Sequence, residues 1–142
     1  MLKKIFLASD HGGYRLKELV KVFLNKQKQP IEDLGCFSLD AVDYPDYAKL
    51  LSDKLKNDLN SQGILFCGTG IGISMAANRY SHIRAALCTT AEMASKSRKH
   101  NNANVLALGG RIITDSLATD IVNEFLNTDF EAGRHSLRVN KI

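Results

Sequence analysis

Short segments rich in apolar residues alternate along the chain with longer segments in which apolar and polar residues are mixed. Five of the short segments have the length of a strand and are bounded by polar or turn-forming residues. They read KIFLA, IEDLG, GILFC, IRAALC and NVLAL, and they cover residues 4–8, 31–35, 63–67, 83–88 and 104–108. The pattern therefore predicts five short strands.

The segments between these strands repeat their apolar residues at helical spacing. In the first of them the repeating residues are Leu16, Leu19, Val20, Phe23 and Leu24. In the second, which follows DYPDY, the predicted apolar stripe consists of Tyr47, Leu50, Leu51, Leu55 and Leu59. A third helix is expected after GTGIG and runs through Met75 and Asn78.

Two further helices are predicted together with the residues that cap their N-termini. Thr90 can cap a helix that carries the small residues Ala91 and Ala94. Thr114 or Asp115 can cap the last long helix. The residues of that helix expected to point inward are Leu117, Ile121 and Phe125.

Strands that alternate with helices form a parallel sheet with helices on both faces. We therefore expect a doubly wound, Rossmann-like α/β fold, built as a single domain from residues 1–142. The sequence shows no internal repeat, linker or low-complexity segment. From about residue 130 the chain becomes polar and basic, EAGRHSLRVNKI, and this tail is predicted to be either frayed or docked.

The composition narrows the class of protein. With 142 residues, of which 44% are hydrophobic and 24% charged, the chain is typical of one globular domain. No apolar run approaches the ~20 residues that a membrane span needs, and the N-terminus does not read as a signal peptide. The cysteines Cys36, Cys67 and Cys88 are an odd number without CxxC spacing. They favour reduced thiols, a cytoplasmic protein and no structural zinc.

The charge balance bears on the partners of the protein. Lys and Arg number 19 against 15 Asp and Glu, which gives a formal charge of +4 and a pI near 9.0. This mild excess fits an anionic ligand as small as a phosphate ester. The lysines of KELVKVFLNKQK lie between apolar helix positions and the chain contains no Trp, so we do not expect nucleic-acid binding.

Polar and titratable residues follow each of the predicted strands. In folds of this class, ligands bind beyond the carboxyl ends of the strands. The residues that fall there are Ser9, Asp10, His11, Asp43, Tyr44, Cys67, Thr89 and Gly109 to Arg111. Each of them alone is compatible with an ordinary loop, but their joint placement predicts a site.

A glycine-rich loop joins the third predicted strand to the helix that follows. Its glycines, Gly68, Gly70 and Gly72, allow a close backbone approach and let successive N–H groups face an anion. The pattern is not the dinucleotide motif GxGxxG, because Ile73 stands where the third glycine belongs. No GK[ST] follows, so it is not a P-loop either.

Cys67 ends the strand directly before this loop. It is either a packed core residue or a reactive thiol. Amides at a helix N-terminus favour the thiolate form, which can act as a base or a nucleophile. Cys36 and Cys88 have no glycine loop beside them and are interpreted as packing residues.

Two of the four histidines and a pair of arginines complete the candidate chemistry. His11 and His100 are the histidines of interest. Arg134 and Arg138 are four residues apart, so on a helical turn they face the same way, and two guanidinium groups side by side suit a phosphate. The alternative is a solvated basic tail.

Five motifs along the chain are similar to those of a known family. ASDHGG, DYPDYA, GILFCGTGIGISMAANR, RKHNNANVLALGGR and GRHSLRV together resemble the ribose-5-phosphate isomerase B family, in order and over essentially the whole chain. That family shares its fold with the galactose-6-phosphate isomerase subunits. The resemblance implies an enzyme of the pentose phosphate pathway that interconverts ribose 5-phosphate and ribulose 5-phosphate without a metal or cofactor.

The resemblance also implies roles for individual residues. Cys67 matches the base that moves the proton between C2 and C1, a task that some members give to a glutamate elsewhere. His100 matches the acid that helps to open the furanose ring. Thr69 and the loop residues Gly68, Gly70, Ile71 and Gly72 match the segment that stabilises the enediolate. The matched substrate contacts are Asp10, Asp43 and Asn101 on the sugar, His11, Arg134 and Arg138 on the phosphate, and Arg111.

The chemistry of the residues agrees with this assignment. A proton beside a carbonyl is weakly acidic, so an isomerase needs a base and a preorganised site for the oxyanion. A thiolate over an amide-lined loop supplies both. His100 ends a helix that precedes the fifth strand, which places it at the opposite end of the sheet from Cys67. We therefore predict a homodimer, or a tetramer, in which His100 and Asn101 enter each active site from the partner.

Two alternatives remain open from the sequence. One is an isomerase of a six-carbon sugar phosphate such as allose 6-phosphate or galactose 6-phosphate; the histidine of KHNN is not expected in the galactose enzymes. The other is a non-catalytic phosphate- or nucleotide-binding module. Such a module accounts for the glycine loop and the basic tail, but not for the joint presence of Cys67, His100 and Asp10.

Overall fold

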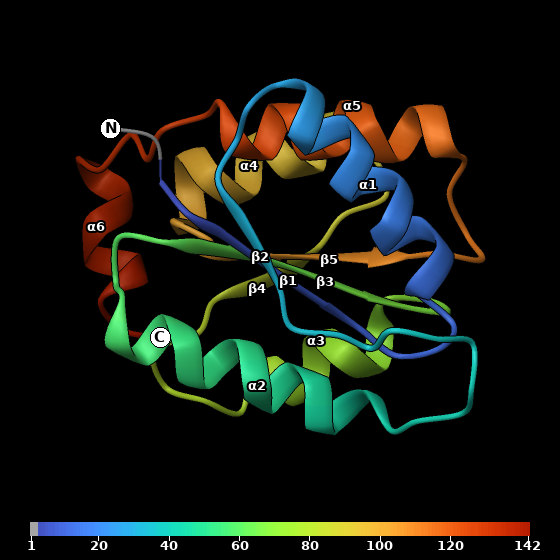
Figure 1. Ribbon diagram of the computed structural model, residues 1–142. Coiled ribbons are helices and arrows are strands. Elements are labelled where there is room, and N and C mark those ends of the chain that lie inside the picture. The colour runs from blue at the N-terminus through green and yellow to red at the C-terminus, as the bar shows by residue number, and fades with distance from the viewer. Residues whose placement is uncertain (1–2) are drawn as a thin grey trace.

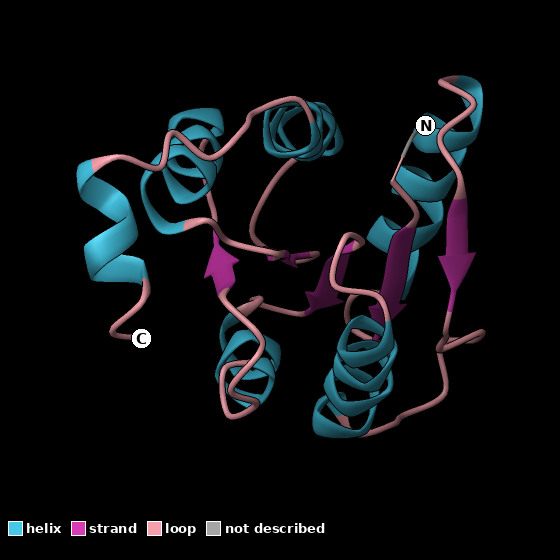
Figure 2. Cartoon of the chain, turned by 90° about the vertical axis from the view of Figure 1, so that its left-hand side faces the viewer, coloured by secondary structure: helices cyan, strands magenta, loops and turns pink. Residues whose placement is uncertain are grey.

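Five parallel strands form a single sheet in the computed structural model, which describes residues 3–142. The order across the sheet is β2-β1-β3-β5-β4 (Figures 1 and 2). The strands are β1 (Ile5–Ser9), β2 (Ile31–Asp33), β3 (Gln62–Cys67), β4 (Ala85–Leu87) and β5 (Val105–Gly109). The predicted α/β fold is confirmed, although β2 and β4 are shorter than the sequence pattern indicates.

Helices cover both faces of this sheet. They are α1 (Tyr14–Lys26), α2 (Tyr44–Asn57), α3 (Ile71–Ala77), α4 (Ala91–Asn101), α5 (Asp115–Leu126) and α6 (Arg134–Val139). Figure 1 shows α1, α4 and α5 on one face and α2 and α3 on the other. No helix among residues 3–142 combines the length and the apolar character needed to cross a membrane.

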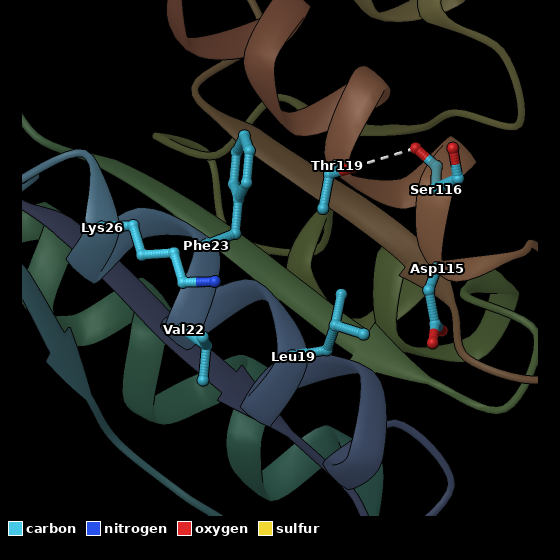
Figure 3. Close-up of a pocket in the computed structure, with 7 residues that line it drawn as sticks. All are labelled: Leu19, Val22, Phe23, Lys26, Asp115, Ser116 and Thr119. Atoms are coloured by element: carbon cyan, nitrogen blue, oxygen red, sulfur yellow. Dashed lines mark hydrogen bonds between the residues drawn. The ribbon is translucent and has the colours of Figure 1, made fainter.

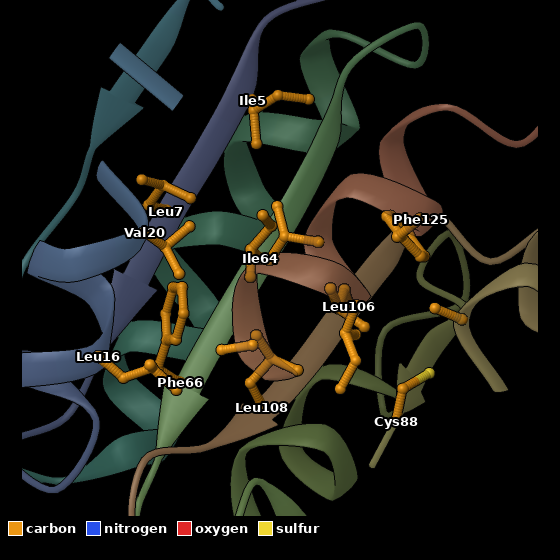
Figure 4. Close-up of a cluster of buried hydrophobic side chains, with 14 of the residues drawn as sticks. Ile5, Leu7, Leu16, Val20, Ile64, Phe66, Cys88, Leu106, Leu108 and Phe125 are labelled. Atoms are coloured by element: carbon orange, nitrogen blue, oxygen red, sulfur yellow. The ribbon is translucent and has the colours of Figure 1, made fainter. Parts of the chain in front are cut away.

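Each face of the sheet has its own hydrophobic core because successive strand residues point to opposite sides. On the α1/α5 side, Leu7, Ile64 and Leu106 pack with residues of the helices (Figure 4). On the α2/α3 side, Ala8 and Leu65 do the same. Strands buried on both faces read as continuous apolar runs, which explains why β1, β3 and β5 are visible in the sequence.

The apolar stripe predicted for α2 is wrong at two positions. Leu50 is 47% exposed, and Leu59 is 77% exposed and lies beyond the end of the helix at Asn57. The buried face consists of Ala48, Leu51, Ser52 and Leu55. Residues at these spacings of three and four share one side of a helix, and Leu50 lies to the side of that stripe. The predicted helix through Met75 is α3, which ends at Ala77 with Asn78 as its C-cap.

Threonine side chains cap two of the helices, and the basic tail forms a helix of its own. The Thr90 hydroxyl accepts the N–H of Met93 at 3.1 Å, and the Thr114 hydroxyl accepts the N–H of Leu117 at 3.2 Å. Thr114, not Asp115, is therefore the cap of α5. The basic tail is docked, since it forms α6 and packs against α4.

Candidate active site

The site begins where β1 ends, with Asp10 and His11. The Asp10 carboxylate is buried, and one of its oxygens accepts the N–H of Gly13 at 3.1 Å. The Nδ1 atom of His11 accepts the N–H of Val42 at 3.2 Å. A neutral imidazole that accepts through Nδ1 carries its proton on Nε2, so His11 can offer an N–H to a ligand.

Cys67 and the glycine loop follow the neighbouring strand β3. The Cys67 thiol is buried, and its Sγ atom accepts the N–H of Gly70 at 3.1 Å. Gly70 has a φ of +79°, a conformation open to glycine at little cost, and this turn brings its N–H back onto the sulfur. The Thr69 hydroxyl accepts the N–H of Ile71 at 3.2 Å at the start of α3. The loop therefore wraps its backbone around the sulfur.

The segment after β5 joins this loop. The N–H of Gly110 donates to the Cys67 carbonyl at 2.8 Å, and the N–H of Arg111 donates to the Gly68 carbonyl at 2.9 Å. The Arg111 side chain lies over Gly68, since a Cβ atom there would be 3.0 Å from its Nη1 atom. The positively charged guanidinium group of Arg111 thus lies beside the glycine loop.

These residues flank the point at which the strand order changes direction. From β1 the chain adds β2 on one side and β3 on the other, and ligands of open α/β sheets bind at such switch points. Gly12 contacts Gly68 closely, because a Cβ atom on Gly12 would be 3.0 Å from the Gly68 nitrogen. We refer to this set as the carboxyl-end group: Asp10, His11, Cys67 to Gly72 and Arg111.

Tyr44 and Asp43 border the carboxyl-end group from the start of α2. The Tyr44 ring covers Gly72, where a Cβ atom would be 2.7 Å from Cζ of the ring. Asp43 is exposed and lies in a groove lined by its own segment, including Val42 and Tyr47. Tyr44 is thus in contact with the glycine loop, whereas Asp43 lies in a groove that no residue of the loop lines.

The remaining predicted residues lie elsewhere. His100, Asn101 and Arg138 line one pocket, with His135, Val139 and Ile142. Arg134 is exposed on the same short helix, α6. In Figure 1 α6 lies beyond the amino ends of the strands, whereas the strand arrows point to the other end of the molecule. We refer to this second set as the amino-end group: His100, Asn101, Arg134, His135 and Arg138.

His135 is the member of this group that sequence reasoning missed. Its ring stacks on that of His100, with centroids 4.3 Å apart and an angle of 16° between the planes. Burial lowers the pKa of His135, and the neighbouring His100 and Arg134 lower it further. Its position between two arginines was the one signal in the sequence. Together with Glu131, the two histidines are the group that could hold a metal ion among residues 3–142.

Another hollow in the surface lies away from both groups. It is a groove between α1 and α5, lined by Leu19, Val22 and Phe23 on one side and by Ser116 and Thr119 on the other (Figure 3). Its lining is mostly apolar, and it contains none of the predicted site residues. The groove therefore belongs to neither group of predicted site residues.

Comparison with known proteins identifies the family of this chain. The model of a family described as Ribose/Galactose Isomerase matches residues 5–142. The chain is 49% identical over 139 residues to the "probable ribose-5-phosphate isomerase B" of Mycoplasma pneumoniae, covering 97% of this chain and 91% of that protein.

Solved structures are equally similar. The ribose 5-phosphate isomerase of Thermotoga maritima superimposes with a TM-score of 0.96 at 50% identity, covering 98% of this chain and 96% of that one. Ribose-5-phosphate isomerase B of Mycoplasma genitalium, solved with bound ribulose-5-phosphate, gives a TM-score of 0.95 at 45% identity, covering 99% and 94%. The chain therefore belongs to the ribose/galactose isomerase family.

Proposed function

We propose that this protein is an aldose-ketose isomerase that interconverts ribose 5-phosphate and ribulose 5-phosphate, with Cys67 as its base. The observation that carries the proposal is the position of the Cys67 sulfur, which accepts the N–H of Gly70 beside a loop of backbone amides. A thiolate needs such donors, and so does an enediolate oxygen. One short segment therefore supplies both the base and the oxyanion site.

The reaction follows from this arrangement. The Cys67 thiolate takes the proton from C2 of the open-chain aldose, and the electrons of that bond form the enediolate. The N–H of Ile71 is bonded to the Thr69 hydroxyl, but the amides that follow it in the first turn of α3 have no partners within the helix and can donate to the enediolate oxygen. The thiol then returns the proton at C1, while the hydroxyl proton moves from O2 to O1. Asp10 holds the sugar next to the loop.

Two subunits are needed to complete the site. His100 and Asn101 lie at the amino ends of the strands, and Cys67 lies at their carboxyl ends. The residues matched to the phosphate are divided in the same way, since His11 belongs to the carboxyl-end group and Arg138 to the amino-end group. A homodimer in which the amino-end group of one chain faces the carboxyl-end group of the other brings them together.

The free thiols bear on where the enzyme works. Cys36, Cys67 and Cys88 are all buried and unpaired. Three reduced cysteines fit a reducing compartment, so we assign the protein to the cytoplasm.

The direct test is an assay of ribose 5-phosphate conversion by chelator-treated protein and by its Cys67→Ala variant. We expect turnover to survive chelation and to fall by about 10³-fold or more in the variant, because the base is lost. Equal turnover in both proteins would mean that a residue other than Cys67 is the base. No turnover on ribose 5-phosphate, with turnover on allose 6-phosphate, would favour the six-carbon substrate.

Mixed dimers test the shared site separately. Neither Cys67→Ala nor His100→Gln dimers should turn over at more than a small fraction of the normal rate. When the two are mixed and their subunits exchange, half of the dimers are hybrids with one intact site, so roughly a quarter of the wild-type rate should return. Failure to regain activity after demonstrated exchange would mean that Cys67 and His100 act within one chain, and would contradict the shared site.

A further inference from the structure

Three potential metal ligands meet where α4, the segment before α6 and α6 itself come together. One ring nitrogen of His100, one of His135 and a carboxylate oxygen of Glu131 all lie within 4.8 Å of one another. His100 is half-buried, Glu131 is exposed and His135 is buried, with 7% of its surface accessible. The cluster is therefore open to solvent on the side of Glu131.

Backbone hydrogen bonds hold the three residues in register. The N–H of Glu131 donates to the Lys99 carbonyl at 3.1 Å, which fixes the approach of this segment to the last turn of α4. The N–H of His135 donates to the Ala132 carbonyl at 3.1 Å and closes the turn that begins α6. The proximity of the cluster thus depends on the docking of α6, not on a chance meeting of long side chains.

We propose that His100, Glu131 and His135 form a binding site for a transition-metal dication such as Zn²⁺. Two imidazoles and a carboxylate are a ligand set that zinc uses when its fourth position is open to water or to another ligand. Zinc bonds of about 2.0–2.2 Å require ligand atoms to be closer than 4.8 Å, so the cluster has to contract. Glu131, which is exposed, can move inward most easily.

The stacked rings determine how the ion enters. An ion bound to an imidazole nitrogen lies near the plane of that ring, and the planes of His100 and His135 are almost parallel. One ring must therefore turn out of the stack. His135 is the more buried of the two, so His100 is the ring that turns.

The charges around the cluster limit its affinity and favour particular ions. Arg134 and Arg138 lie on α6 and oppose a cation, whereas the Glu131 carboxylate attracts it. We therefore expect weaker binding than in a structural zinc site. Imidazole nitrogens prefer Zn²⁺, Co²⁺, Ni²⁺ and Cu²⁺ to Mg²⁺ and Ca²⁺, which prefer oxygen ligands.

Occupation of the site has a consequence that rests on the proposed function. A metal ion on His100 takes the nitrogen lone pair and the orientation that the ring needs to open the sugar. The dication is then an inhibitor, not an activator, and a chelator restores the rate. Competition with substrate is expected because the same ring cannot serve both.

The binding test does not depend on activity. Equilibrium dialysis of the intact protein should show one Zn²⁺ per chain in the wild type, and Co²⁺ should give the intense visible bands of a tetrahedral site. We expect Glu131→Gln to weaken Zn²⁺ binding by at least about tenfold and His135→Gln to abolish it. Mg²⁺ should not displace the ion.

Two matched controls identify the ligands. His82→Gln removes a histidine whose ring bonds to the Ser52 carbonyl, away from the cluster, and should leave binding unchanged. Cys67→Ala should also retain the ion; loss of binding in this variant would assign the metal to the thiol and overturn the proposal. Binding that persists in both His135→Gln and Glu131→Gln, or no binding in the wild type, would do the same.

The inhibition test separates this proposal from the proposed function. Glu131→Gln, which lies outside the proposed catalytic residues, should have the wild-type rate without metal and need at least about tenfold more Zn²⁺ for half inhibition. If the protein proves inactive on sugar phosphates, the proposed function fails while the dialysis result still decides the metal site. If Zn²⁺ binds at the cluster and the rate stays unchanged, the inhibitory role is wrong.

Discussion

The carboxyl-end group and the amino-end group are held in place by different means. At the carboxyl end, backbone hydrogen bonds tie the loops of adjacent strands together, as in the bond from Gly110 to the Cys67 carbonyl. At the amino end, the contacts include the stack of His100 on His135, a backbone bond from Glu131 to Lys99 and a bond from the Arg98 side chain to the Thr128 carbonyl. The first group lies in loops anchored to the carboxyl ends of the strands, whereas the second lies on α4 and on α6, which packs against α4.

This difference matches the chemistry that each group is proposed to perform. A base and an oxyanion site must be preorganised to a fraction of an ångström, because small displacements lose much of the rate. Long arginine side chains on a surface helix can adapt to a phosphate and still bind it. The following variants test whether the carboxyl end is the rigid side of the molecule.

The largest effect is expected from an alanine at Gly13, compared with one at Gly133. A Cβ atom on Gly13 would lie 2.5 Å from both the Cβ and the carbonyl oxygen of Phe66, inside the sheet. We expect Gly13→Ala to lower the free energy of unfolding by about 3 kcal/mol or more. Gly133 has a φ of +57° and a ψ of −128°, with nothing within 4 Å of its Cβ position, so Gly133→Ala should cost only the backbone strain of this conformation, about 1–3 kcal/mol.

Urea unfolding of both variants measures this contrast. Equal losses of stability would mean that the two ends of the sheet are equally tolerant of backbone change. A larger loss of stability at Gly133 would mean that the segment before α6 tolerates backbone change less well than the carboxyl end of the sheet does.

A smaller loss is expected when Asp33 at the end of β2 is replaced by Asn. Its carboxylate accepts from Lys17 at 2.6 Å and from Lys21 at 2.7 Å, and the Lys17 side chain has no exposed surface. The variant leaves the Lys17 ammonium with Glu18, at 3.0 Å, as its remaining ion-pair partner. Removing one partner of a buried pair costs about 3–5 kcal/mol, and Glu18 should reduce this to about 2–3 kcal/mol.

The stability that Asp33 contributes should depend on pH. Burial alone would raise the pKa of Asp33, but the hydrogen bonds from Lys17 and Lys21 lower it below its ordinary value of 3.8. A lowered pKa stabilises the folded state above about pH 4, and this stabilisation is lost as the pH falls further. The stability gap between wild type and Asp33→Asn should therefore narrow between pH 6 and pH 3. A constant gap would mean that Asp33 is not ionised in the folded protein.

The parts of the fold that the sequence predicts are those fixed by local pattern. Strands buried on both faces, helical spacing in α1 and the cap at Thr90 depend on residues close in the chain. The gathering of Asp10, Cys67 and Arg111 also follows, because parallel strands end at one edge of a sheet. The order of helices and strands along the chain also predicts that His100 and Cys67 lie at opposite ends of the sheet.

The predictions that were wrong or missed concern residues whose burial or hydrogen bonds depend on tertiary contacts. Leu50 fits a helical stripe as well as Leu51 does, and only the position of the sheet shows which of them is buried. The burial of His135 depends on α6 docking against the end of α4. The bond from Val42 to His11 joins residues that are 31 positions apart, and no local pattern signals it.

A more modest effect is expected at the amino end when His135 is replaced by alanine. The variant loses the stack on His100, a contact worth about 0.5–1.5 kcal/mol, and should release α6 without unfolding the sheet. Hydrogen exchange should then become fast in α6 and remain slow in β1 and β3. Loss of protection throughout the molecule would show that the amino-end group is as integral to the fold as the carboxyl-end group.

The smallest effect is expected at Thr90, because it tests only the far end of the helix that carries His100. Thr90→Ala removes the hydroxyl that accepts the N–H of Met93 and should cost about 0.5–1 kcal/mol, whereas Thr90→Ser should retain most of the cap. Fraying at the first turn of α4 does not reach its last turn, where His100 lies against His135. Turnover by Thr90→Ala at a temperature well below its unfolding transition should therefore equal that of the wild type. A lower rate would mean that the position of His100 depends on the whole length of α4, and that the amino-end group is less locally held than its contacts indicate.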